Sequence, residues 1–552
     1  MATKSYFYYL LLLISILIST IPGLGVLEFF RHTEADRALI AEEMQQTGNY
    51  IVPHLLGQPI LTKPPIYYWL SAFTFQLTGK ASEFEARLPS VLSAVLLAFA
   101  HFTAARYAGL TLLSSFASTL VLISSFSFFT LSALAEIDML FAALCSVSLY
   151  LLYFSISKAS FLLTILSYIF TALAFLTKGP PIIAFYAVSC LCFYFLTNRS
   201  YPLRKFVLFN TIGILVFTVI LSIWLIPLCR EIDFSILKQQ FNREIVGRAI
   251  SQPRKERGFL FYIGTLLGSC LPWTLFVVVA SYYEKISWRE KFNQHKSFLQ
   301  FCAIVFVSGF CLLSLAKGKS SRYLFPLHTF VIQCLSFALF QTKEFWLRDK
   351  VRIATRNIFY SLTALFLVAN LVVALSKLGI VEVVWTLPFL FFLCSVGFYL
   401  SKREIQYAFL ALVLSVLACR MIQTKVYYPY RNSQLSVKPI VDSIHKHIGT
   451  ESVYTAEMYE RWIIYYLKKS SVPVLQLQGL KTIVPEQSKF FWLVTDKDES
   501  DLLELLKQDP SSVLVSKYEL PSTNMFLYLS ETTKAMEILN QIKLTRKERE
   551  TY

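Results

Sequence analysis

Long runs of apolar residues follow one another along the first 425 residues of this chain. A helix needs about 20 predominantly apolar residues to cross a bilayer. Counted in this way, the pattern predicts a polytopic α-helical membrane protein with about 13 transmembrane helices. Lys4 precedes the first run and no clear cleavage site follows it, so we expect this run to remain as a helix. The runs lie near residues 6–27, 88–107, 110–132, 138–156, 160–177, 181–197, 205–229, 258–282, 298–316, 323–341, 356–377, 380–400 and 405–425.

From about residue 426 the apolar runs stop, and shorter segments of two different periods alternate. Helical spacing is present in KPIVDSIHKHI, ERWIIYYLKK and ESDLLELLKQ. Strand-like spacing is present in ESVYTA, VPVLQL, KFFWLVT, SVLVSKYEL and MFLYLS. The pattern predicts a small α/β domain over residues 426–552, which follows a transmembrane domain over residues 1–425.

Composition agrees with a membrane protein, because 55% of the residues are hydrophobic. The net charge of +17 comes largely from every second loop between the apolar runs, while the loops in between are less basic. The positive-inside rule assigns the basic set of loops to the cytoplasm. The outer set then contains loops 28–87 and 230–257, the short loop at Glu136, the loop 317–322 and the C-terminal domain. Most of the positive charge is a topology signal, so we expect no nucleic-acid partner. The basic set contains Lys4, Arg106, Lys158, Arg199–Lys205, Lys285–Lys296, Lys343–Arg356 and Lys402–Arg403.

Cysteine and histidine spacing argues against a metal site. All ten cysteines fall in apolar segments, which leaves no disulfide framework or thiolate site in the C-terminal part. The seven histidines lack ligand spacing, and the sequence has no glycine-rich phosphate loop, dinucleotide fingerprint or Ser/His/Asp arrangement. We therefore expect an activity that needs no nucleotide and requires no cofactor.

The first outer loop begins with acidic residues. Glu34 and Asp36 lie at the membrane boundary, just before a predicted helix over residues 38–44. Asp36 alternatively serves as the N-cap of that helix, and both acids are alternatively solvated loop residues. Glu42 and Glu43 are expected on its solvent face.

Cations occur on three outer loops, against the topology bias. Lys63 precedes two prolines, Tyr67 and Trp69, a combination that suits either a membrane-lying re-entrant segment or contact with an anionic lipid headgroup. Lys178 stands in a tight turn that is alternatively only a helix stop. The segment Lys317–Arg322 is alternatively a solvated charge run. Lysine and arginine on an outer face also suit a lipid phosphate.

Two further acids, Glu136 and Asp138, open a predicted membrane span. Acids at such a position are costly unless they are solvated, paired or functional. The alternative is that a helix N-terminus simply favours anions there. Of the two, Asp138 is the candidate functional residue.

Taken in order, these motifs resemble a known family. They are AEEMQQTGNYIVPHLLGQPILTKPPIYYWL, then FEARLPS, then Asp138 opening a span, then LTKGP and RYLFPLH, and the segment KQQFNREIVGRA is similar to the family's second large loop. The sequence resembles the bacterial lipid A 4-amino-4-deoxy-L-arabinose transferases and the related protein O-mannosyltransferase-like enzymes of the GT-C class. The resemblance covers residues 25–330 and is strongest over 33–91. It implies a GT-C fold, a polyprenyl-phosphate-sugar donor, an outward-facing site and an inverting transfer.

The resemblance also implies roles for single residues. Many relatives carry Asp-Glu at the start of the first motif, where this chain has Thr33 and Glu34. The catalytic base is therefore either Glu34, which we favour, or Asp36, while Asp138 matches the family's second acid. A divalent metal between the carboxylates is possible but not required. The residues expected to handle the lipid phosphate or sugar are Lys63, Tyr67, Lys178, Arg322 and Tyr323.

Three functions remain open. The leading hypothesis is a monomeric glycosyltransferase of the bacterial inner membrane, acting at the periplasmic face on lipid A, another envelope glycolipid or glycan, or protein. The second is a transporter or flippase of lipid-linked sugars, although such proteins place charges in mid-span and repeat their halves. The third is a membrane-anchored scaffold whose outer domain binds a partner.

Overall fold

The computed structural model groups the chain into two compact units. The first contains residues 1–26, 61–67 and 87–428, and the second contains residues 27–60, 68–86 and 429–552. The described residues are 2–29, 32–197, 201–242, 257–258, 260–270, 273–274, 295–340, 353, 357, 424, 427–448, 453–455, 461–469, 474–476, 489–495, 500–508, 512–519 and 524–531.

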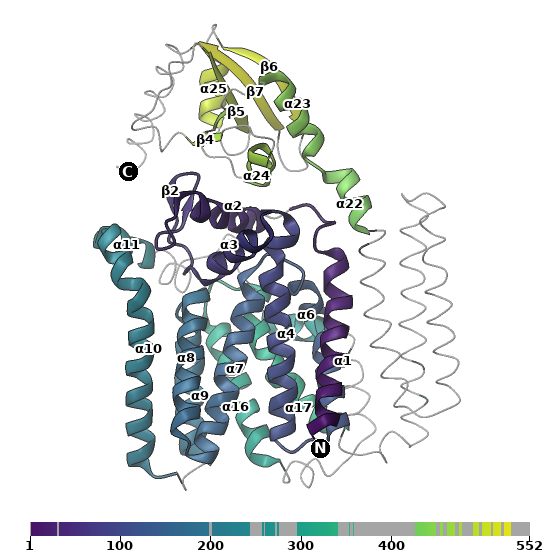
Figure 1. Cartoon of the computed structure of the whole chain (residues 1–552), viewed down its shortest axis with the longest axis vertical. Helices are drawn as coiled ribbons and strands as arrows, with labels where there is room; N and C mark the ends of the chain where they lie inside the picture. Colours follow the sequence, from purple (N-terminus) through teal and green to yellow (C-terminus); the bar gives the residue numbers. More distant parts are fainter. Residues whose placement is uncertain are drawn as a thin grey trace. The chain divides into compact units, whose positions relative to one another are not determined.

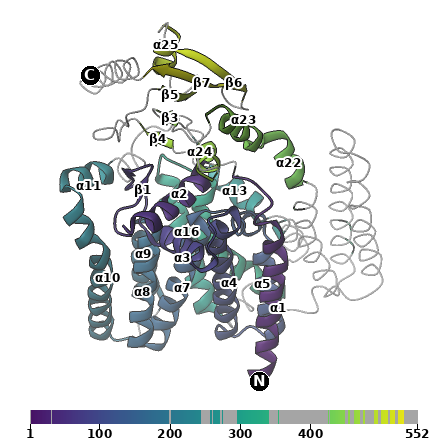
Figure 2. The ribbon, with the colours of Figure 1, turned by 45° about the horizontal axis from the view of Figure 1, so that its top comes forward.

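The first unit is helical, and its long helices run side by side (Figure 1 and Figure 2). Among the described residues, α4, α7, α8, α10 and α16 are long and apolar enough to cross a membrane. The prediction of a multi-pass helical membrane protein is thus confirmed. The elements are α1 (Ala2–Thr20), η1 (Ile21–Gly23), α4 (Glu83–Tyr107, from residue 87), α5 (Leu112–Ile123), α6 (Phe126–Leu131), α7 (Ile137–Lys158), α8 (Phe161–Lys178), α9 (Pro181–Thr197), α10 (Leu203–Glu231), α11 (Phe234–Phe241), α13 (Phe261–Ser269), α16 (Lys296–Leu315), η3 (Ser321–Leu324) and α17 (Phe325–Phe340).

Burial separates the central helix of this unit from a peripheral one. In α7, 83% of the most apolar 18-residue window is buried inside the protein, against 22% in α10. The exposed side chains of α10 include Val207, Leu215, Val219 and Ile223. A large exposed apolar face of this kind suits contact with lipid. The central α7 carries the acids considered below.

One predicted span is wrong. The run 110–132 was expected to form a single helix, but α5 ends at Ile123 and α6 begins at Phe126. Ser124 and Ser125 separate the two helices and direct their hydroxyls to the carbonyls of Leu120 and Leu122. Serine competes in this way with regular helical hydrogen bonding. A hydropathy average over 20 residues does not register two small polar residues.

A buried polar network joins four helices of the first unit. The ring of His101 on α4 contacts Ser118 of α5 and Thr329 of α17, each at 2.8 Å. The hydroxyl of Tyr150 on α7 lies 2.9 Å from Thr329, and Gln333 donates to the His101 carbonyl. Buried polar groups need such partners, so these contacts specify how the four helices pack.

Several predicted segments are described only in part. Of the run 258–282, the structure describes α13 and a few neighbouring residues, and of the outer loop 230–257 it describes α11 and the ends. The runs 356–377, 380–400 and 405–425 lie almost entirely outside the described residues. The number of 13 transmembrane helices therefore stays a prediction.

In the second unit, the segment predicted as a polar outer loop contains ordered elements: α2 (His32–Thr47), a hairpin of β1 (His54–Leu55) and β2 (Gln58–Pro59), and α3 (Ile66–Thr78, from residue 68). The expectation that Glu43 faces solvent is wrong. Its side chain is buried and accepts hydrogen bonds of 2.8 Å from the backbone N–H groups of Leu56 and Gly57. Those two residues form the hairpin turn, and both have positive φ.

All eight helices and strands predicted after residue 426 form in the structure, as a mixed five-stranded sheet in the order β4-β3-β5-β7-β6 and the helices α23, α24 and α25. Helix α22 is a further element that the pattern did not predict. Strands β3, β4 and β5 are parallel, whereas β5, β7 and β6 pair antiparallel. The elements are α22 (Tyr428–Leu435, from residue 429), α23 (Lys438–Ile448), β3 (Val453–Thr455), α24 (Arg461–Lys469), β4 (Val474–Gln476), β5 (Lys489–Thr495), α25 (Ser500–Gln508), β6 (Val513–Glu519) and β7 (Asn524–Glu531).

Helix α24 ties the C-terminal segment to both ends of the first loop. The hydroxyl of Tyr466 accepts from the Phe29 N–H at 3.0 Å and donates to Glu83 Oε1 at 2.7 Å. Tyr465 donates to the Ala81 carbonyl at 2.8 Å. The ammonium Nζ of Lys438 lies 3.3 Å from Glu28 Oε1. The loop and the C-terminal segment thus form one unit, although 384 and 383 residues separate Tyr465 and Tyr466 from their partners in the loop.

Tyr466→Phe should lower the free energy of unfolding by about 1–3 kcal/mol, because it leaves the buried Glu83 carboxylate and the Phe29 N–H without this hydroxyl. Thermal unfolding in detergent, followed by tryptophan fluorescence, measures the loss. Burial and the charge of Glu83 raise the pKa of Tyr466 above its ordinary value. The contribution is therefore full below pH about 10 and is lost as the pH rises through the raised pKa.

Tyr50→Phe is the matched control, since Tyr50 lies in the same unit and is 38% exposed. It should change stability by less than about 0.5 kcal/mol. Equal effects of the two substitutions would contradict the role given to the Tyr466 hydroxyl.

Candidate functional site

Two acids stand at the N-terminus of α7. Glu136 is the N-cap residue, and Asp138 lies in the first turn. Their side chains are 0% and 5% exposed. A helix N-terminus favours anions, but two carboxylates buried this deeply also need cationic partners.

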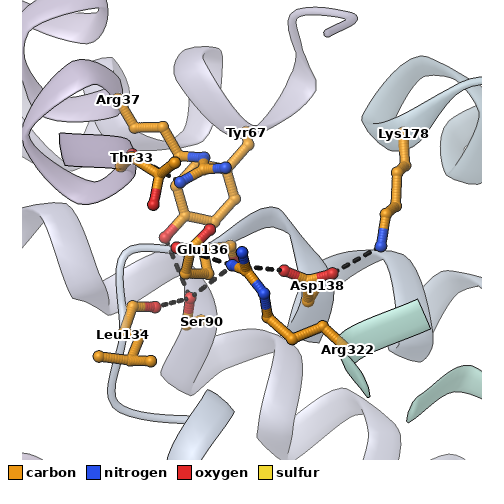
Figure 3. Close-up of polar contacts among 9 residues, drawn as sticks. All are labelled: Thr33, Arg37, Tyr67, Ser90, Leu134, Glu136, Asp138, Lys178 and Arg322. Atoms are coloured by element: carbon orange, nitrogen blue, oxygen red, sulfur yellow. Dashed lines mark hydrogen bonds and ion pairs between the residues drawn. The ribbon is translucent and has the colours of Figure 1, made fainter. Parts of the chain in front are cut away.

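Two predicted cations supply these partners, and Figure 3 shows them reaching Asp138 from opposite sides. Lys178 Nζ lies 2.5 Å from Asp138 Oδ1. Arg322 Nη1 lies 2.9 Å from Glu136 Oε1 and 3.5 Å from Asp138 Oδ2. The four side chains, which we call the charge cluster, come from α7, α8 and η3. Such a cluster can hold an anion and can accept a proton.

Lys178 owes its position to the end of α8. It is the last residue of that helix, and Gly179 follows with φ 89°, a conformation that suits glycine. The interpretation of this turn as a helix stop is therefore confirmed. The Lys178 ammonium also lies 5.2 Å from the ring centroid of Phe141 and 4.9 Å from that of Tyr323. Tyr323 thus reaches the charge cluster through Lys178.

The turn before α7 is braced from two other helices (Figure 3). Ser90 of α4 donates to the Leu134 carbonyl at 2.6 Å, and its oxygen lies 3.3 Å from the Glu136 carbonyl. The Tyr67 hydroxyl lies 3.0 Å from the Ser90 hydroxyl, and Tyr67 is 0% exposed. Tyr67 therefore supports the backbone that carries Glu136, and its role in substrate binding stays a prediction.

Lys63 is in the first unit, on the segment before α3, and is partly exposed. Its ammonium donates to the carbonyl of Thr62 at 2.9 Å. Its proposed contact with a lipid phosphate stays a prediction.

Glu34 and Asp36 belong to the second unit, where both lie inside α2. The structure corrects the expectation that they precede a helix: α2 begins at His32, so Asp36 is not its N-cap. Glu34 is 1% exposed and Asp36 is half-buried. On the same helix, Arg37 donates to the Thr33 carbonyl at 2.6 Å (Figure 3).

Sequence reasoning missed two residues of the site. The sequence shows Glu136 as an acid but points to Asp138 as the functional residue, and Ser90 stands in it only as the last residue of the FEARLPS motif. The signal for Glu136 was present, because a second acid two residues before Asp138 at the mouth of a span also needs a partner. The role of Ser90 does not follow from the local sequence, since its partners lie 23 and 44 residues away.

Within the part of the chain that the structure describes, no group of three or more His, Cys, Asp or Glu side chains is arranged to hold a metal ion. In the charge cluster the carboxylates contact Lys178 and Arg322 instead. The expectation that no cofactor is required stays a prediction.

Comparisons with known proteins agree with the resemblance found in the sequence. The family model described as dolichyl-phosphate-mannose-protein mannosyltransferase matches residues 5–240. The chain is 27% identical over 331 residues to the undecaprenyl phosphate-alpha-4-amino-4-deoxy-L-arabinose arabinosyl transferase of Serratia proteamaculans. This match covers 59% of this chain and 58% of that protein. It is 25% identical over 299 residues to arabinosyl transferase 2 of Proteus mirabilis, covering 53% and 52%. These matches span slightly more than half of each relative.

Among solved structures, the chain is similar to ArnT from Cupriavidus metallidurans bound to undecaprenyl phosphate. The TM-score is 0.71 at 16% identity, over 96% of this chain and 98% of that one. The apo form gives a TM-score of 0.69. At this identity the likeness concerns the fold. The predicted resemblance to GT-C glycosyltransferases is confirmed, as is the mostly helical architecture.

Proposed function

We propose that this chain is an integral membrane glycosyltransferase that moves a sugar, with inversion, from a polyprenyl-phosphate donor to an envelope acceptor. The acceptor is lipid A, another glycolipid or glycan, or protein. The reaction takes place at the periplasmic face of a bacterial inner membrane. The proposed division is a transmembrane domain over residues 1–425 and a periplasmic domain over 426–552, in a monomer.

The observation that carries this proposal is the charge cluster, in a fold shared with a protein that binds undecaprenyl phosphate. A lipid phosphate is a stable anion when it leaves the sugar, so the reaction needs cations near the phosphate and a base for the acceptor's proton. Arg322 and Lys178 are cations beside carboxylates. We assign the base to Glu34 or Asp36 and a second acidic role to Asp138.

The transporter hypothesis is not favoured. Transporters place their ionisable residues near the middle of spans. Here Asp138 is in the first turn of α7, Lys178 is the last residue of α8, and Arg322 lies in η3, directly before α17. Charges at helix ends suit a site that opens at a membrane face.

The experiment that tests the function compares transfer with transport. The purified full-length protein in proteoliposomes is given labelled undecaprenyl-phosphate sugars, with lipid A, surface glycans or protein as acceptor. We expect label on an acceptor and a matching mass increase in envelope material from cells that express the protein. Movement of the labelled donor across the bilayer, without transfer to any acceptor, would establish the transporter instead.

A further inference from the structure

The charge cluster consists of two carboxylates and two cationic side chains. The four side chains differ widely in exposure: Glu136 0%, Asp138 5%, Lys178 10% and Arg322 36%. Buried ions are tolerated only when they are paired. A phosphate that enters must therefore contact a cation without leaving an acid uncompensated.

Lys178 is committed to Asp138. Its ammonium lies 2.5 Å from Asp138 Oδ1, and the rings of Phe141 and Tyr323 lie within 5.2 Å of it. These contacts leave only 10% of the side chain exposed. Reaching a phosphate would require Lys178 to leave a buried carboxylate.

Arg322 is arranged differently. Both of its contacts with the acids use one nitrogen, Nη1. A guanidinium carries five N–H donors in a rigid planar fork, and more than a third of this side chain is exposed. Arg322 can therefore bind an anion while its contacts with the acids persist.

Glu136 fixes the orientation of Arg322. Its carboxylate is fully buried and lies closer to Nη1 than Asp138 does, at 2.9 Å against 3.5 Å. Its backbone is held by the turn that Ser90 and Tyr67 brace. If Glu136 were removed, Arg322 would have Asp138 as its remaining partner in the cluster, and a bidentate pair between them would occupy the guanidinium fork.

We propose that Glu136 is a positioning residue that holds Arg322 for the lipid phosphate, and that Lys178 is the counterion of Asp138 and does not bind the phosphate. This inference rests on the proposed function, because it names how the donor is held. It gives different roles to Lys178 and Arg322, which carry the same charge and which the sequence analysis both assigns to the lipid phosphate.

The test measures binding of undecaprenyl phosphate to full-length protein in detergent, by thermal shift and native mass spectrometry. Glu136→Ala should raise the Kd by ~10–100-fold, which is the fold-change expected from the loss of one hydrogen bond to a charged group. Glu136→Gln keeps an acceptor for Nη1 and should remain within about three-fold of wild type. In transfer assays the same change should appear in the donor KM, with kcat and the acceptor KM much less affected.

The control is Glu85→Ala, which removes another buried acid from the first turn of a helix. It should leave the Kd unchanged. Equal Kd values for Glu136→Ala and wild type, or equal losses in the alanine and glutamine variants, would overturn the positioning role. Because binding is measured without turnover, a protein that binds undecaprenyl phosphate in this pattern but transfers no sugar would refute only the proposed function.

Discussion

Glu34→Gln is expected to lower the turnover number of sugar transfer by ~10²–10⁴-fold, the range that general base catalysis contributes. Glutamine is nearly isosteric with glutamate but cannot take the acceptor's proton. Glu34 is 1% exposed in the first turn of α2, so its carboxylate is shielded from bulk water. The measurement is kcat with saturating donor and acceptor, on protein whose folded fraction has been checked.

Two other acids of α2 make the experiment decisive. Asp36→Asn tests the alternative base, and Glu42→Gln is a control on the same helix. We expect both to keep kcat within about ten-fold of wild type, well short of a lost general base. A loss confined to Asp36→Asn would transfer the role to Asp36. If all three variants kept full activity, none of these three acids of α2 would be the general base.

Lys178→Met is expected to lower the free energy of unfolding by about 3–5 kcal/mol, because it leaves the buried Asp138 carboxylate without its nearest cation. The double variant Asp138→Asn/Lys178→Met should recover most of this loss, since it removes both buried charges together. Thermal unfolding in detergent measures both effects. The double variant should remain inactive in transfer, because the carboxylate of Asp138 is absent.

Lys158→Met is the matched control. Lys158 is the last residue of α7, and its ammonium lies 5.4 Å from the ring of Tyr107 at an exposed position. Its loss should cost about 0.5–1 kcal/mol. If Lys178→Met cost no more than this, or if the double variant were no more stable than Lys178→Met, the ion pair would not stabilise the bundle as argued.

Period and composition predicted the local elements well. KFFWLVT and MFLYLS form adjacent strands with Trp492 opposite Tyr528, as alternating β-branched and aromatic residues favour. The failures have both local and tertiary causes. Ser124 interrupts a span and accepts a hydrogen bond from Trp273, 149 residues away. Glu43 is buried because a hairpin turn later in the chain folds over it.

The sequence alone determined that this is a multi-pass helical protein with a terminal segment of helices and strands, because hydrophobic run length and period are local properties of the chain. It also pointed to Asp138, Lys178 and Arg322, because charges beside membrane spans are costly unless they are solvated, paired or functional. Only the tertiary structure decided that these three meet, across 40 and 184 residues, and that Glu136 joins them. Helix packing sets those distances, and the pairing of buried charges follows from them.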